Sequence, residues 1–140
     1  MNRIFQFAYI SESAPGTSAS DVESIVHKAR TCNASRSITG LLIYNAGHYM
    51  QFLEGPQEAT LACFEKVRQD RRHHTVHPFF EGSADTRAFE AWTMAYRNFE
   101  SYEPFLRTKF EESVFAVTRG EIVYTREAAL EVMHLFARTW

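Results

Sequence analysis

The chain has 140 residues, a formal net charge of −2, 45% hydrophobic residues and 23% charged residues. A chain of this length and apolar content can bury a core without disulfides, and its charge offers no basic surface for nucleic acid. Cys32 and Cys63 form no CxxC motif, and we find no secretory or membrane-length apolar segment. We therefore expect a cytoplasmic protein without a membrane or nucleic-acid partner.

The hydrophobic pattern predicts strands and helices in alternation. Strands show apolar residues with a period of two, and helices show apolar residues three and four positions apart. Ser20 with Glu23 three residues later is typical of a capping box, and Gly55 followed by Pro56 predicts the start of a second helix. In chain order we predict a strand over 3–10, a helix from Ser18 or Ser20 to about Asn33, strands over 41–44 and 49–53, a helix over 56–70, strands over 75–82 and 89–96, and helices over 103–117 and 126–139.

The order βαββαββ predicts an α+β domain of the ferredoxin-like type, whose antiparallel or mixed sheet has two helices on one face. Pro78 cannot donate to a strand ladder, so its strand is expected at an edge or with an irregularity. The two C-terminal helices are expected to cover the second face of the sheet, which includes Ile4, Met50 and Phe52. This organisation predicts a sheet domain over 1–98 and a helical extension over 99–140.

Several polar side chains are expected on the face that the first two helices cover. Gln51 lies inside an apolar strand, so its amide should be buried and should need hydrogen-bond partners. Tyr9 ends the first strand, Asn33 ends the first helix, and Asp70 and Arg72 follow the second helix. These groups could converge on a planar ligand with a polar edge. The alternative is that Tyr9 and Gln51 are satisfied by backbone groups.

Two other groups of residues have weaker support. A metal site would draw on His48, His73, His74 and His77. No carboxylate or thiolate lies at tight spacing with these histidines, and surface histidines are the simpler interpretation. Trp92 and Met94 share one face of the last predicted strand, for which core packing is the alternative to a functional role.

The motifs together resemble those of the BLUF family, the flavin-binding sensors of blue light. The resemblance covers about residues 3–96 and rests on YIS around Tyr9, Asn33 followed by SITGLLIY, and then GHYMQFLEGP, QDRRHH and FEAWTM in that order. Several separated motifs in one order are more specific than any single motif. The resemblance implies that FAD, with FMN possible, is held non-covalently between the two helices, so that 1–98 would be the flavin-binding domain.

The resemblance also implies a role for each matching residue. Tyr9 would donate an electron and a proton to the photoexcited flavin, and Gln51 would bridge Tyr9 and the flavin atoms N5 and O4. Trp92 or Met94 would respond to the hydrogen-bond change at Gln51 and transmit it to the last strand and the C-terminal helices. The other cofactor-binding positions would be Asn33 at the flavin O4 and N3 edge, Arg72 at O2, Asp70 on the ribityl side, Lys66 and His73.

Two positions depart from the family pattern. Cys32 stands where members often carry Asn or His, and Lys66 stands where an Arg can occur. The first puts a contact to the ring in doubt, and the second keeps the charge but loses the planar geometry of a guanidinium.

We therefore expect a photoreceptor that is not an enzyme and has no output enzyme attached. It would signal through protein contact, as a homo-oligomer (a dimer or larger) and through a downstream signalling protein that the sequence does not identify. The alternative is a flavin-binding redox sensor or adaptor without photoactivity, against which the pair Tyr9 and Gln51 argues. A small ferredoxin-like enzyme using the histidines and a metal is the third hypothesis.

Overall fold

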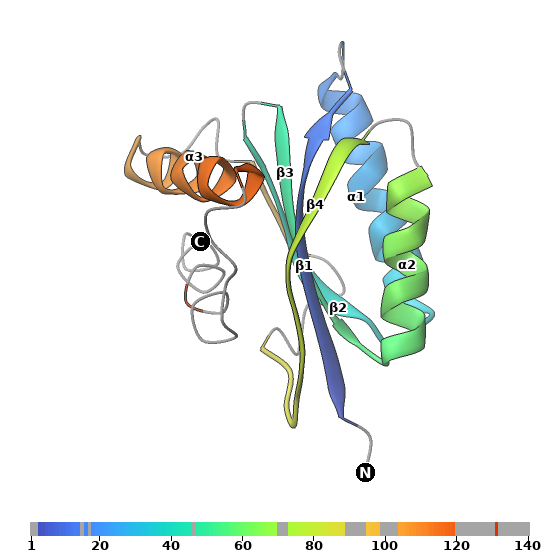
Figure 1. Ribbon diagram of the computed structural model, residues 1–140. Helices are drawn as coiled ribbons and strands as arrows, with labels where there is room; N and C mark the ends of the chain where they lie inside the picture. The colour runs from blue at the N-terminus through green and yellow to red at the C-terminus, as the bar shows by residue number, and fades with distance from the viewer. Residues whose placement is uncertain are drawn as a thin grey trace.

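The computed structural model describes residues 3–14, 16, 18–45, 47–69, 73–88, 95–98, 104–119 and 131. Its elements are β1 (Ile4–Ser13), α1 (Ala19–Ala34), β2 (Thr39–Asn45), β3 (His48–Gly55), α2 (Gln57–Gln69), β4 (His73–Ala84), β5 (Ala95–Asn98) and α3 (Pro104–Thr118). The described strands form one sheet in the order β4-β1-β3-β2-β5. Helices α1 and α2 lie on one face of this sheet and α3 lies on the other (Figure 1). The α+β fold with two helices on one face is confirmed.

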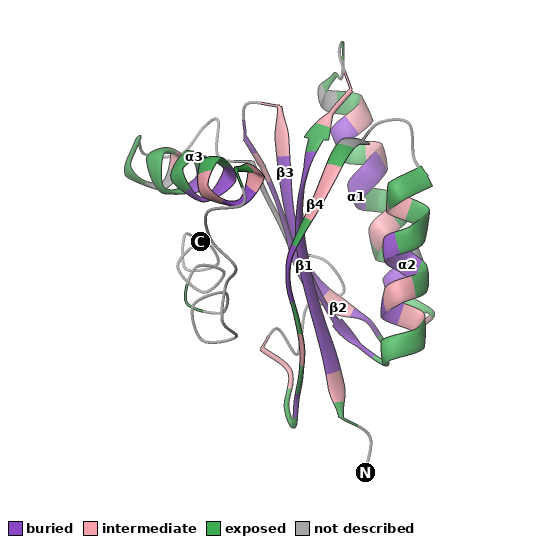
Figure 2. Ribbon diagram, in the orientation of Figure 1, coloured by how far each residue is buried: buried purple, intermediate pink, exposed green. Residues whose placement is uncertain are grey.

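The centre of the sheet is the antiparallel pair β1 and β3. The sheet is mixed, because β2 pairs with β3 in antiparallel fashion and with β5 in parallel fashion. Gln51 lies opposite Tyr9 on β1 and opposite Leu42 on β2. The turn between β2 and β3 includes Gly47 with φ +84°, a conformation that glycine adopts without steric cost. The predicted hairpin is therefore confirmed, and β1 and β3 are buried along most of their length (Figure 2).

The first helix begins next to Ser18, one of its two predicted starts, but its capping box and the start of the second helix differ from the prediction. Ser18, with an extended backbone, is the N-cap of α1, and its capping box is completed by Asp21. The predicted box of Ser20 and Glu23 is wrong, because Ser20 already lies within the helix. Gly55 is not an N-cap, since it ends β3, and α2 begins one residue after Pro56.

The edge strand β4 bears out the expectation for Pro78. It pairs only with β1 among the described strands, and its register shifts between Ala8 and Tyr9, where Pro78 lies opposite Tyr9. A proline is tolerated there because the ladder is interrupted at an edge.

Part of the C-terminal prediction lies outside the described residues. Of the strand predicted over 89–96, residues 89–94 are outside, and the described strand is Ala95–Asn98. Helix α3 matches the helix predicted over 103–117. Of the helix predicted over 126–139, only Glu131 is described, and it is helical.

Each face of the sheet has its own buried cluster. Between the sheet and α1 and α2 the cluster is Phe5, Phe7, Tyr9, Val22, Ile25, Val26, Ile38, Leu42, Tyr49, Leu53, Cys63 and Phe64. On the face toward α3, Phe52 stacks on Phe80 at 6.5 Å between ring centroids, and Phe110 of α3 is fully buried. We call these the α1–α2 face and the α3 face. Within the described ranges, no helix has the length and apolar character needed to cross a membrane.

Candidate functional site

The polar pair predicted from the sequence lies at the centre of the α1–α2 face. Tyr9 and Gln51 occupy directly opposite positions on β1 and β3. The Tyr9 hydroxyl donates a hydrogen bond to Oε1 of Gln51. Tyr9 is fully buried and Gln51 is 4% exposed, so this bond is shielded from water. The expectation that Gln51 is buried and faces a polar partner is confirmed, and that partner is a side chain.

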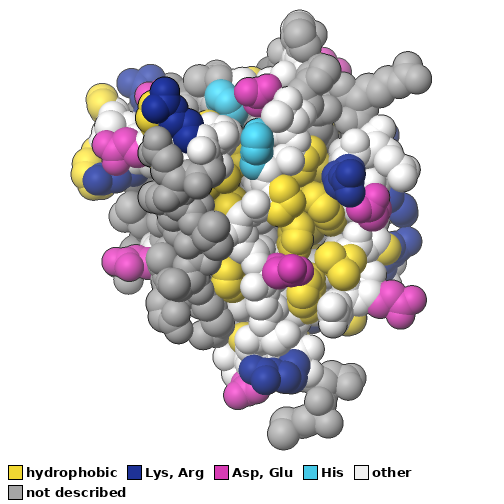
Figure 3. Space-filling model, in the orientation of Figure 1, with side chains coloured by type: hydrophobic (Ala, Val, Ile, Leu, Met, Phe, Trp, Pro, Cys, Tyr) yellow, Lys and Arg dark blue, Asp and Glu magenta, His cyan; other side chains and the backbone are white. Residues whose placement is uncertain are grey.

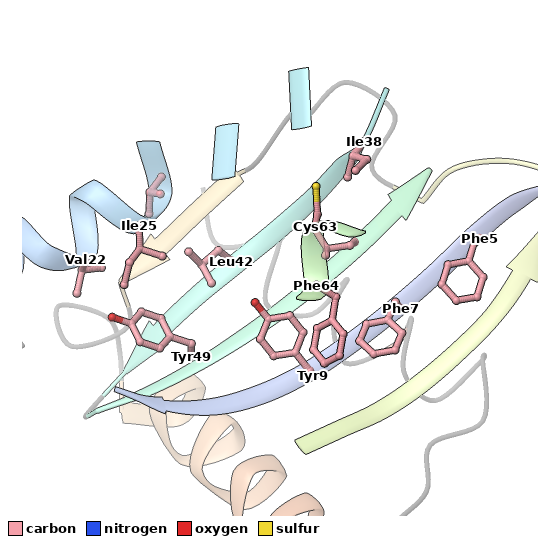
Figure 4. Packing of buried hydrophobic residues seen from close by; sticks show 12 residues of the cluster. Phe5, Phe7, Tyr9, Val22, Ile25, Ile38, Leu42, Tyr49, Cys63 and Phe64 are labelled. Atoms are coloured by element: carbon pink, nitrogen blue, oxygen red, sulfur yellow. The ribbon is translucent and has the colours of Figure 1, made fainter. Parts of the chain in front are cut away.

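Aromatic packing fixes the position of the Tyr9 ring. Phe64 of α2 lies 5.2 Å from Tyr9 and 4.5 Å from Phe7, measured between ring centroids. Figure 4 shows these three rings side by side, with the Tyr9 hydroxyl pointing away from Phe7. Contacts of this kind leave the phenol one orientation, in which its oxygen is presented to Gln51.

The end of α1 brings a second buried amide to the same face. Asn33 is only 2% exposed, as its helical spacing from Ala29 predicted. Its backbone carbonyl accepts hydrogen bonds from the N–H groups of Arg36 and Ile38, both at 3.1 Å. These bonds form a tight turn that includes Ser37 in the left-handed region, with φ 58°. The turn thus holds Asn33 at the junction of α1 and β2.

Helix α2 contributes a polar group that sequence reasoning missed. Thr60 is fully buried and shares one side of α2 with Cys63 and Phe64. Its Oγ1 atom has no hydrogen-bond partner in the part of the chain that the structure describes. The signal in the sequence was its spacing, since Thr60 lies three and four residues before Cys63 and Phe64. A threonine in such a position was not distinguishable from a surface residue.

Of the remaining predicted positions, only Lys66 has a described side chain. Lys66 is exposed on α2. His73 lies in β4, but its side chain is outside the described residues, as are Asp70, Arg72, Trp92 and Met94. The roles assigned to these residues stay predictions.

The histidines of the metal hypothesis are also only partly described. Nε2 of His48 lies 3.8 Å from a carboxylate oxygen of Glu12. Among the side chains that the structure describes, no three His, Cys, Asp or Glu residues form a group that could hold a metal ion.

The surface over this face is apolar along one edge. Figure 3 shows hydrophobic side chains gathered between β4 and α2. Val67 of α2 and Val76 of β4 are half-buried hydrophobic residues that pack against the cluster beneath. The site is thus enclosed by apolar side chains and built from uncharged polar groups.

The site is thus a buried phenol and two buried amides, held on a mixed sheet beneath two helices. The family model described as "BLUF: Sensors of blue-light using FAD" matches residues 4–95. The chain therefore belongs to the BLUF family.

Individual relatives agree with this assignment. Photoactivated adenylate cyclase subunit alpha of Euglena gracilis is 38% identical over 87 residues, covering 62% of this chain and 8% of that protein. The chain spans 8–10% of the length of this relative and of two similar cyclase subunits. These relatives thus carry the family domain as a small part of a longer chain.

Solved structures have the same fold. BlrB, described as a BLUF protein in its dark state, has a TM-score of 0.72 and 25% identity, and the match covers 85% of this chain and 92% of that one. BlsA in its photo-activated state has a TM-score of 0.79 and 23% identity, with coverage of 98% and 96%. At 23% identity the likeness to BlsA shows the fold alone.

The residues of the α1–α2 face fit a flavin. The ring edge of a flavin carries both carbonyl acceptors and an N–H donor, and a primary amide offers both a donor and an acceptor to such an edge. Gln51 and Asn33 supply two buried amides, and the hydroxyl of Thr60 is a further buried polar group, with no hydrogen-bond partner among the described residues. The donor set thus matches the cofactor for which the family is named.

Proposed function

We propose that this chain is a blue-light sensor that holds FAD non-covalently between α1 and α2 and signals through protein contact. The observation that carries the proposal is the buried hydrogen bond from the Tyr9 hydroxyl to Gln51. A site that only stored a flavin would not need a phenol in contact with an amide. A site that must move an electron and a proton and then restore them needs both groups.

The chemistry of the two side chains suggests how the response arises. Bound FAD supplies the absorption of blue light and an excited state that accepts an electron. Tyr9 gives up an electron and its hydroxyl proton, and later takes both back, so that the cycle leaves no net oxidation. Gln51 carries an acceptor on one side of its amide and a donor on the other. Rotation or tautomerisation of this amide exchanges the two and leaves a different hydrogen-bond pattern at the end of the cycle.

The change at Gln51 has a short route to the α3 face. Asn45 and His48 flank the turn between β2 and β3, and with Phe110 and Val114 of α3 they line a groove of about 280 Å³. A displacement of β3 would therefore move the hairpin end that borders this groove. We infer that the extension over 99–140 is the output region, and that a second copy of the chain or a downstream protein binds one of its arrangements more tightly.

The test is the absorption spectrum of the purified protein, reconstituted with FAD, in darkness and after blue light. We expect the bands of oxidised flavin to shift slightly to the red and to return in darkness. Bound flavin that bleaches or does not respond would favour a redox sensor or adaptor. Failure to bind flavin even after reconstitution would refute both hypotheses. Size-exclusion chromatography in both states then tests whether light changes assembly.

A further inference from the structure

A row of polar side chains crosses the α3 face near the end of β3. Glu54 lies opposite Gln6 on β1 and opposite Thr39 on β2, so the three residues are direct neighbours across three strands. Nε2 of Gln6 donates to Oε2 of Glu54 at 3.2 Å, and Oγ1 of Thr39 donates to Oε1 at 3.4 Å. Gln6 and Glu54 are both fully buried. A carboxylate removed from water needs such donors, because its desolvation is costly.

The chain that leaves β4 joins this row through side chain and backbone. The backbone N–H of Ala88 donates to Oε2 of Glu54 at 2.8 Å. The guanidinium of Arg87 donates to Oγ1 of Thr39 at 2.9 Å, to the backbone carbonyl of Glu54 at 3.1 Å and to that of Ser37 at 2.5 Å. The planar fork of arginine allows one side chain to reach these three acceptors. Thr39 accepts from Arg87 and donates to Glu54, so it links the two charged groups.

The strand order requires a long connection between β4 and β5, and Arg87 and Ala88 lie in that connection. Strands β4 and β5 lie at opposite edges of the sheet, so the chain between Ala84 and Ala95 must pass β1, β3 and β2. With strands about 4.8 Å apart, the crossing spans roughly 19 Å. Arg87 and Ala88 are bound to residues of β2 and β3, which lie partway along this crossing. The place of Arg87 and Ala88 relative to β3 is therefore set by these bonds.

We propose that Glu54, Thr39 and Arg87 are positioning residues that tie the chain entering β5 to β3, so that a rearrangement at Gln51 is transmitted to β5. The inference rests on the proposed function and adds residues that lie away from the α1–α2 face. Glu54 is three residues from Gln51 on the same strand, or about 10 Å along it. Gln51 also lies opposite Leu42, which lies opposite Tyr96 of β5. A shift of β3 thus reaches β5 through the strand ladder, and it reaches Arg87 and Ala88 through their hydrogen bonds to Glu54.

The experiment uses the full chain loaded with FAD and compares Arg87→Lys with Arg3→Lys. Lysine keeps the charge at position 87 but cannot bridge three acceptors. Arg3 is the matched control, because among the described residues it forms only a long, exposed ion pair with Asp85, at 3.8 Å, two residues before Arg87. Thr39→Val is a second variant, which removes the linking hydroxyl without changing volume much. The readouts are the red shift of the flavin and the hydrogen–deuterium exchange of Ala88 and of residues 95–98, in darkness and in light.

In darkness we expect exchange at Ala88 and over 95–98 to be at least tenfold faster in Arg87→Lys and Thr39→Val than in the wild type, and within twofold in Arg3→Lys. In light, Arg87→Lys and Thr39→Val should keep the full red shift but lose most of the light-induced change in exchange over 95–98. Unchanged exchange in darkness, or an undiminished light-induced change, would overturn the proposal. If the wild type shows no red shift, the proposed function fails, and the comparison in darkness still decides whether these residues position the crossing chain.

Discussion

The two faces of β3 share one backbone but carry different chemistry. On the α1–α2 face, the middle of the strand presents Gln51, an uncharged amide that accepts a hydrogen bond from Tyr9. On the α3 face, the end of the strand presents Glu54, whose carboxylate oxygens accept bonds from Gln6, Thr39 and the Ala88 backbone. Both groups are buried, so each depends on partners from neighbouring strands.

The two groups differ in whether their hydrogen-bond pattern can change. A primary amide exchanges donor and acceptor when it rotates, whereas a carboxylate only accepts. Rotation of the Gln51 amide therefore changes the hydrogen-bond pattern around it. Rotation of the Glu54 carboxylate would not, because both of its oxygens are acceptors. The strand thus combines a group suited to switching with a group suited to anchoring.

The largest expected effect comes from Tyr9→Phe, which removes the phenol but keeps the ring. We expect the light-induced red shift to disappear, while FAD content stays within about twofold of the wild type. Loss of one donor to a buried amide should lower the free energy of unfolding by about 1–3 kcal/mol. Absorption spectra before and after blue light measure the first effect, and urea denaturation measures the second. Tyr44→Phe is the control, because Tyr44 lies opposite Tyr49 near the turn of the hairpin, two positions along β2 from the residue opposite Gln51. The red shift of this variant should persist.

Each face of the sheet has a buried phenylalanine ring that a helix supplies. Phe64 on α2 and Phe110 on α3 are buried, at 6% and 0% exposure. Phe64→Ala and Phe110→Ala should each lower the free energy of unfolding by about 3–5 kcal/mol. Only Phe64→Ala should also weaken FAD binding, because this ring packs against Tyr9. Flavin content and urea denaturation separate the two effects.

Milder variants keep this comparison measurable if the alanine variants unfold. Phe64→Leu and Phe110→Leu should give the same ordering with smaller losses of stability. An equal loss of FAD in both variants would contradict the proposal that the flavin binds on the α1–α2 face and not on the α3 face.

The smallest effect is expected at the start of α1, away from both polar groups. Ser18→Ala removes the N-cap of α1 and should lower the free energy of unfolding by about 1 kcal/mol, since the Asp21 N–H loses its acceptor at 3.2 Å. Ser20→Ala should cost less, because Ser20 lies inside the helix. Thermal unfolding of the two variants compares them directly. If Ser20→Ala lowered the free energy of unfolding as much as Ser18→Ala or more, Ser18 would not be the N-cap.

Much of the α1–α2 face could be predicted because its signals are local. Apolar alternation placed Tyr9 and Gln51 toward the helices, and helical spacing from Ala29 turned Asn33 inward. The starts of the helices were harder to predict. Ser18 with Asp21 and Ser20 with Glu23 both place an acidic residue three positions after a serine, so the pattern did not distinguish them.

The sequence by itself determined which residues face which side of each strand, because side-chain alternation and helical spacing are properties of a short stretch of backbone. Only the tertiary structure decided which strands are neighbours and in which register. Gln6, Thr39, Glu54 and Arg87 are far apart along the chain, and no local pattern marks them as a group. They meet because the pairing of β1, β3 and β2 aligns three of them and the chain crossing toward β5 brings the fourth.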